Sequence, residues 1–168
     1  MRYPHSRMAA AVILGAAYIS AAALYAAEPP PPAPAPGSPA LYLSNEQLSA
    51  VMKASMAKGD DPALSQIAST DQYFINRVHR TKITGAAAHL GWTEVHLILG
   101  GSATFVTGGE IKPSGIMKVI EGGVSRKVGK GDVIVVPAGT PHWYKEIDGS
   151  VDAIEVRFIA PGSAKAAQ

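Results

Sequence analysis

The stretch formed by residues 131–143, GDVIVVPAGTPHW, constrains the fold of this chain more than any other. Its apolar run, Val133–Val136, stands between a Gly-Asp pair and a turn with the pattern Pro-x-Gly-x-Pro. An apolar run bounded by turn residues is typical of a fully buried β-strand. The turn is tight because proline fixes φ at about −65° and glycine tolerates positive φ. His142 follows the turn directly, so we expect its side chain to point into a barrel or sandwich.

The chain from residue 72 onward has the pattern of an all-β domain. Short apolar runs alternate with breaks that are rich in glycine. Many short strands separated by glycine turns predict a sandwich or a barrel with few exposed edges. The strands are expected at residues 73–83, 94–99, 102–107, 116–120, 124–128, 133–136, 142–147 and 153–159.

One helix is expected ahead of these strands. Ser44 can cap its first turn, and Gln47 stands at the reciprocal position of a capping box. Apolar residues then recur at helical spacing from Leu48 to Met56, and a Gly-Asp-Asp-Pro segment that begins at Gly59 ends the pattern. We expect this helix to cover one side of the barrel or to form a dimer interface.

The stretch that ends at His142 resembles the second conserved motif of the cupin superfamily, G-x5-P-x-G-x2-H-x3-N. The final Asn of that motif is replaced by Glu146. The resemblance covers roughly residues 72–158, and it implies a single double-stranded β-helix (jelly-roll) barrel with a short N-terminal helix. The matching positions are Gly131, Pro137, Gly139 and His142.

The first cupin motif, G-x5-H-x-H-x3-4-E-x6-G, is partly present upstream. Glu94 and Gly101 keep the spacing of its last two positions, and His89 precedes Glu94 by the gap allowed for the second histidine. The first histidine of the motif would fall on Ala87, and its leading glycine on Thr81. The first motif therefore departs from the family pattern at two positions.

The resemblance implies one divalent metal ion inside the barrel. In the superfamily, two histidines and the glutamate of the first motif and the histidine of the second surround the metal. His89, Glu94 and His142 occupy three of these positions. Imidazole and carboxylate ligands together suit Mn, Fe, Co, Ni, Cu or Zn.

His96 is the candidate to replace the missing fourth ligand. Residues two apart on a strand share a face, so His96 should point inward with Glu94. In one alternative, His89, Glu94, His96 and His142 form a complete ligand set. In the second, His96 lies too deep and three ligands leave the open coordination that a catalytic metal needs. In the third, the histidines are hydrogen-bonded barrel residues of a vestigial site.

Three further side chains are candidates for substrate binding. Tyr144 lies two residues after His142, so both should face inward while Trp143 faces out. Phe105 is expected to line the pocket, with ordinary core packing as the alternative. Arg77 would pair with a substrate carboxylate if it faced the interior, and the alternative is a solvated outer face.

The last expected strand carries two charged residues. Glu155 and Arg157 alternate with Ile154, Val156 and Phe158. Because successive side chains of a strand point to opposite faces, we expect the apolar residues to face the core. The two charged residues are then expected to form a cross-strand pair on the surface.

The N-terminal part of the chain has the pattern of an exported protein. A basic start and an apolar segment make residues 1–27 a signal peptide or, if uncleaved, a membrane anchor. Residues 28–40 are a Pro-rich linker, residues 41–162 the cupin domain, and residues 163–168 a disordered tail. We expect a periplasmic or secreted protein, with anchoring to the inner membrane as the alternative. The chain has no cysteine, which excludes a lipid-modified cysteine and disulfides.

These features predict an exported cupin that binds a divalent metal and acts on or binds a small molecule. The alternative is a metal-free ligand-binding or sensing domain without catalysis, and a third is a structural partner in a homodimer. The charge pattern shows no basic stripe with interleaved aromatic residues, which argues against nucleic-acid binding. Membrane contact would involve the N-terminal segment alone. Whether the domain is an enzyme, and what its substrate is, the sequence leaves open.

Overall fold

The structure is a computed structural model and describes residues 34–159. The segment expected to be a signal peptide or anchor, the first part of the Pro-rich linker (residues 28–33) and the C-terminal tail lie outside these residues. Within them, no helix is long and apolar enough to span a bilayer. The described elements, in chain order, are α1 (Asn45–Met56), β1 (Ala63–Ser69), β2 (Tyr73–Arg80), β3 (Trp92–Thr107), β4 (Glu110–Ser114), β5 (Met117–Glu121), β6 (Val124–Gly129), β7 (Val133–Val136) and β8 (His142–Ile159).

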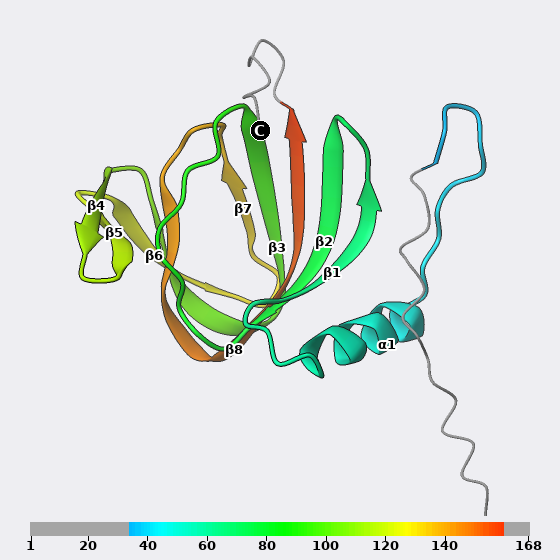
Figure 1. The fold of residues 1–168 in the computed structure, drawn as a ribbon, viewed down its shortest axis with the longest axis horizontal. Helices are drawn as coiled ribbons and strands as arrows, with labels where there is room; N and C mark the ends of the chain where they lie inside the picture. Colours follow the sequence, from blue (N-terminus) through cyan, green and yellow to red (C-terminus); the bar gives the residue numbers. More distant parts are fainter. Residues whose placement is uncertain (1–33, 160–168) are drawn as a thin grey trace, which may run out of the picture.

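Two long antiparallel strands, β3 and β8, form the centre of the fold (Figure 1). They pair from Trp92 opposite Ile159 to Thr107 opposite His142. Strands β2 and β1 extend the sheet beside the second half of β8, and β7 pairs with the first half of β3. Strand β6 pairs with the second half of β3. Because β3 and β8 bend, they contribute to both layers of a jelly-roll barrel, as predicted.

The bends correct the expected strand boundaries. We expected β3 to break at the glycines 100–101 and β8 to break between residues 147 and 153, but both strands continue through these points. Gly101 has a φ of 72° and lies at a register shift, where a side chain would overlap the carbonyl of Ser150. Glycine at such a bulge turns a strand without ending it. The structure also has two strands that the sequence did not predict, β1 and β4.

Strand β7 is correctly placed but is not fully buried. Val133 and Val135 are each 60 % exposed, whereas Val136 is only 2 % exposed. The strand pairs with β3 alone, so it is an edge strand with one face toward solvent. A continuous apolar run therefore indicated a strand here but not its burial.

Helix α1 packs against the outer face of β1 beside β2 (Figure 1). Its capping box between Ser44 and Gln47 is present as predicted. Ser55 donates a side-chain hydrogen bond to the carbonyl of Leu64, and Ser65 donates one to the carbonyl of Val51. These bonds attach the helix to β1 through polar groups, which explains why its buried apolar face is narrower than expected.

The β4–β5 hairpin covers one side of the barrel (Figure 1). Trp143 faces away from the interior, as expected, but it is only 8 % exposed because Ile111 and Ile120 of the hairpin pack against its cluster. Its Nε1 donates a 2.6 Å hydrogen bond to the carbonyl of Thr84. The apolar core proper lies inside the barrel and consists of Ile98, Ala103, Phe105, Val128, Val136, Tyr144, Val151 and Ala153.

Candidate metal centre

Three segments bring His89, Glu94 and His142 together. Glu94 lies on β3, and His142 is the first residue of β8, while His89 lies in the loop before β3. The backbone joins these segments, because the amide of Gly139 donates to the carbonyl of His89 and because Ala87 and His142 form an antiparallel bridge. The two histidines are therefore held close together by main-chain hydrogen bonds.

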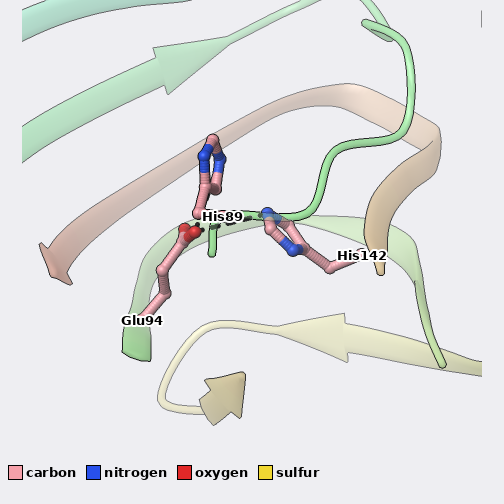
Figure 2. A group of neighbouring side chains, drawn as sticks. All are labelled: His89, Glu94 and His142. Atoms are coloured by element: carbon pink, nitrogen blue, oxygen red, sulfur yellow. Dashed lines mark ion pairs between the residues drawn. The ribbon is translucent and has the colours of Figure 1, made fainter. Parts of the chain in front are cut away.

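The side chains of these three residues converge on one point (Figure 2). Nε2 of His89 lies 3.4 Å from Oε1 of Glu94, and Nε2 of His142 lies 3.6 Å from the same oxygen. One potential ligand atom from each residue lies within 4.8 Å of the other two. We call His89, Glu94 and His142 the outer cluster, since the His89 side chain is 33 % exposed.

His96 lies on the other side of the Glu94 carboxylate. Its Nε2 is 3.4 Å from Oε2 of Glu94, and Nε of Arg157 is 3.0 Å from that same oxygen. The structure therefore brings together three of the four predicted ligands and places His96 behind them. This geometry corresponds to the alternative with three protein ligands.

His96 belongs to a second group of polar side chains, Arg80, His96, Tyr144 and Glu155, which we call the inner cluster. Arg80 donates a 2.8 Å hydrogen bond from Nη2 to Oε1 of Glu155. Nδ1 of His96 lies 3.2 Å from the Tyr144 hydroxyl and 3.4 Å from Oε1 of Glu155. The Arg80 guanidinium also lies over the Tyr144 ring, 5.2 Å from its centroid. Every member of this cluster thus has a polar or charged partner.

The prediction of a surface pair at Glu155 and Arg157 is wrong. Both residues face the interior, where Arg157 lies opposite Glu94 and Glu155 opposite His96. Glu155 is only 3 % exposed. The sequence carried one signal, because the small apolar residue Ala153 shares their parity on the strand. The more strongly apolar residues of the other parity face outward and hid that signal.

The outer cluster has the protonation states that metal ligands require. Burial lowers the pKa of both His89 and His142, and the positive charge of Arg157 lowers the pKa of His89 further. Burial alone would raise the pKa of Glu94, but its contacts with His96, His142 and Arg157 outweigh burial and lower it. Neutral imidazoles and an ionised carboxylate are the forms that bind a metal.

In the inner cluster, the pKa of the histidine is shifted in the opposite direction. Burial opposes ionisation of Glu155, but His96 and Arg80 outweigh it and lower its pKa. Burial would lower the pKa of His96, but the neighbouring carboxylates of Glu155 and Glu94 raise it. Burial and the charge of Glu155 raise the pKa of Tyr144, so its hydroxyl stays protonated. The charged side chains of this cluster therefore neutralise one another in ion pairs.

The unsatisfied atoms of Glu94 test whether a metal fits. Both carboxylate oxygens of Glu94 are buried and have no hydrogen-bond partner in the described part of the chain. Arg157 pairs with Oε2 at 3.0 Å, so Oε1, which faces the two outer imidazoles, is the oxygen without a charged partner. A buried carboxylate oxygen without a partner is costly unless it coordinates a metal. Two imidazoles and one carboxylate are a ligand set found in catalytic metal sites. The residues therefore fit a divalent metal.

The predicted substrate-binding residues have different fates. Phe105 and Tyr144 lie inside the barrel next to the clusters, with the Phe105 ring stacked at 6.3 Å from that of His142. Arg77 lies opposite Ile154 on the outer face of the sheet, so the structure does not bring it to the centre. The alternative in which Arg77 faces outward, and not into the barrel, agrees with this geometry.

A cavity of about 480 Å³ opens between β6 and β7, and its lining includes no member of the outer cluster itself. Two of its lining residues are direct neighbours of that cluster, since Val136 lies opposite Glu94 and Phe105 stacks on His142. Its rim carries the exposed Arg126. A cavity of this size suits a small molecule.

The family profile of the cupins, described as "Cupin", matches residues 55–161, well over half of the chain. The chain belongs to the cupin family. This confirms the resemblance that the two motifs indicated. No curated protein gives a significant sequence match.

Solved structures share the fold at low sequence identity. A Bacillus halodurans protein is 12 % identical, with a TM-score of 0.51, over 76 % of this chain and 89 % of its own. A cupin superfamily protein from Desulfitobacterium hafniense DCB-2 is 18 % identical, with a TM-score of 0.43, over 58 % and 76 % of the two chains. The DMSP lyase DddQ from Ruegeria pomeroyi DSS-3 is 22 % identical, with a TM-score of 0.44, over 63 % and 51 %. At these identities, the likeness concerns the fold alone.

Proposed function

We propose that this cupin binds one divalent metal ion through His89, Glu94 and His142, and that it binds or converts a small molecule at the coordination positions left open. The observation that carries the proposal is the Glu94 carboxylate, whose two buried oxygens lack hydrogen-bond donors although three imidazoles and a guanidinium surround them. A metal bound there would supply a Lewis acid.

The protein's own residues prepare this chemistry. Glu94 supplies the negative charge, and the lowered pKa values of the two outer histidines leave their lone pairs free at neutral pH. His142 is oriented by its Nδ1, which lies 3.1 Å from the carbonyl of Thr140 and leaves Nε2 for the metal. Phe105 stacks on the same ring and shields it from water. The cavity beside Phe105 would admit the small molecule.

Metal analysis of the purified full chain tests the proposal. We expect close to one divalent metal per chain after growth with added metals, and loss of most of it in Glu94→Gln and His142→Ala. His79→Ala is the matched control, because His79 lies on the outer face of the sheet and pairs with Asp152. Metal-free protein after supplementation would refute the metal site and favour the metal-free binding domain that the missing first-motif histidine, Ala87, suggests.

We also propose that the protein is exported, on the composition of residues 1–27. Fractionation of cells that express the full chain should place it in the periplasm, in the medium or, if the segment is retained, in the inner-membrane fraction. Recovery in the cytoplasmic fraction alone would refute export without affecting the metal site.

A further inference from the structure

The carboxylates and the guanidinium groups inside the barrel are equal in number, so no carboxylate is left over to offset a metal. Two carboxylates, Glu94 and Glu155, face two guanidinium groups, Arg80 and Arg157. A divalent metal at the outer cluster would add two positive charges that no described interior carboxylate offsets. Uncompensated charge in a buried site is costly, so the loaded site calls for an anion.

Arg157 is placed to meet such an anion. Its Nε lies 3.0 Å from Oε2 of Glu94, and its guanidinium lies over the ring of Phe74, 5.2 Å from the centroid. Its ion pair with Glu94 runs through Nε, and within residues 34–159 its two Nη groups donate no hydrogen bond. The side chain is 23 % exposed, whereas Arg80 is 13 % exposed and already bonded to Glu155. Arg157 is therefore the interior guanidinium with donors to spare.

Two of the side chains around the Glu94 carboxylate reach solvent, His89 on the Oε1 side and Arg157 on the Oε2 side. The His89 side chain is 33 % exposed, whereas the His142 side chain is only 9 % exposed. Arg157 is close enough to His89 for its charge to lower the pKa of that imidazole. Arg157 is thus partly exposed to solvent and lies next to the carboxylate that the outer cluster shares with His96.

We propose that the small molecule bound at this centre is a carboxylate, and that Arg157 binds its carboxylate group beside the metal. The inference rests on the proposed metal function and names its ligand class. A planar guanidinium matches the two oxygens of a carboxylate, so the contact would be directional as well as electrostatic. The cavity between β6 and β7 has a mixed lining, with apolar Phe105 and Val136 and the cations Arg126 and Lys127, which suits an organic acid.

The test uses the full chain loaded with Co²⁺, whose visible spectrum reports on ligands. Acetate is titrated in a buffer free of carboxylates, with acetamide as the uncharged molecule of the same shape. We expect acetate to change the spectrum at lower concentration than acetamide. Arg157→Gln should weaken acetate binding by about a hundredfold and Arg157→Lys by about tenfold, because lysine keeps the charge but lacks the planar fork.

Two control variants locate the effect. Arg77→Lys makes the same exchange on the outer face of the sheet and should bind acetate like the native chain. Arg126→Gln removes one of the two cations that line the cavity, leaving Lys127, and should change the affinity less than Arg157→Gln. Cobalt content is measured in every variant, and it should stay close to one per chain in Arg157→Lys.

The outcomes separate the inference from the proposed function. A native chain that takes up no cobalt refutes the metal site and the inference with it. A loaded chain that binds acetamide as well as acetate refutes only the inference. Unchanged acetate affinity in Arg157→Lys and Arg157→Gln also refutes the inference. A loss of acetate affinity that is larger in Arg126→Gln than in Arg157→Gln refutes it as well.

Discussion

The outer and inner clusters lie on either side of one carboxylate and solve the problem of buried charge in different ways. In the inner cluster, Glu155 is paired with Arg80 and His96 at distances of 2.8 and 3.4 Å. In the outer cluster, Glu94 has an ion pair with Arg157 at 3.0 Å through Oε2, while Oε1 faces only the imidazoles of His89 and His142 and accepts no hydrogen bond. Charge alone therefore does not mark a binding site. A buried carboxylate oxygen that accepts no hydrogen bond is the better marker of a binding site.

The largest expected difference between the clusters is in metal-free stability. Glu155→Gln should lower the free energy of unfolding by about 3–5 kcal/mol, because it leaves Arg80 and His96 buried without their anion. His89→Ala should cost less than about 1 kcal/mol in the same protein, since its ring is partly exposed. Urea denaturation of the metal-free chains measures both. Equal losses would break the distinction between the two clusters.

The loss of folding stability at acid pH should depend on the inner cluster. The folded-state pKa of Glu155 lies below its ordinary value of 4.5, so the folded protein binds this proton less readily than the unfolded chain. The stabilisation by Glu155 is complete above about pH 4.5 and is lost as the pH falls further, toward the folded-state pKa. The gap between native and Glu155→Gln urea midpoints should therefore narrow in acid. A gap that does not depend on pH would contradict the ionised pair.

A new ligand should strengthen the outer cluster alone. Ala87 forms a backbone bridge with His142, and directly paired residues share a face, so Ala87→His would place an imidazole next to the centre. We expect metal affinity to rise by about tenfold, or about 1.4 kcal/mol, in competition with a chelator. Thr81→His, at the other departure from the first motif, is the control and should leave the affinity unchanged. No gain at Ala87 would mean that the centre lies elsewhere.

The smallest expected effect concerns His96. His96→Gln should leave the metal content close to one per chain and the visible spectrum of the Co²⁺ form unchanged, because His96 faces Oε2 of Glu94 while the other ligands face Oε1. A lower metal content or an altered spectrum would instead support the set of four ligands.

The sequence predicted the features that depend on local patterns. The turn before His142, the capping box at Ser44 and the family motifs led to the jelly-roll barrel and to three converging residues. It failed at Glu155 and Arg157, where the side that faces inward depends on pairing between β8 and β3. Alternation gives two faces but does not say which one is the interior. The depth of His96 was undetermined for the same reason.

The main-chain links around His89 have a further consequence. Gly139 and the bridge between Ala87 and His142 hold the ligand-bearing segments through amide and carbonyl groups alone. Such links do not use the side chains that bind the metal, although Gly139 itself has a φ of 76°, which favours glycine. A metal ligand could therefore be lost or regained by substitution of one residue, while the backbone of the barrel stays intact. The chemistry of this scaffold can drift faster than its architecture.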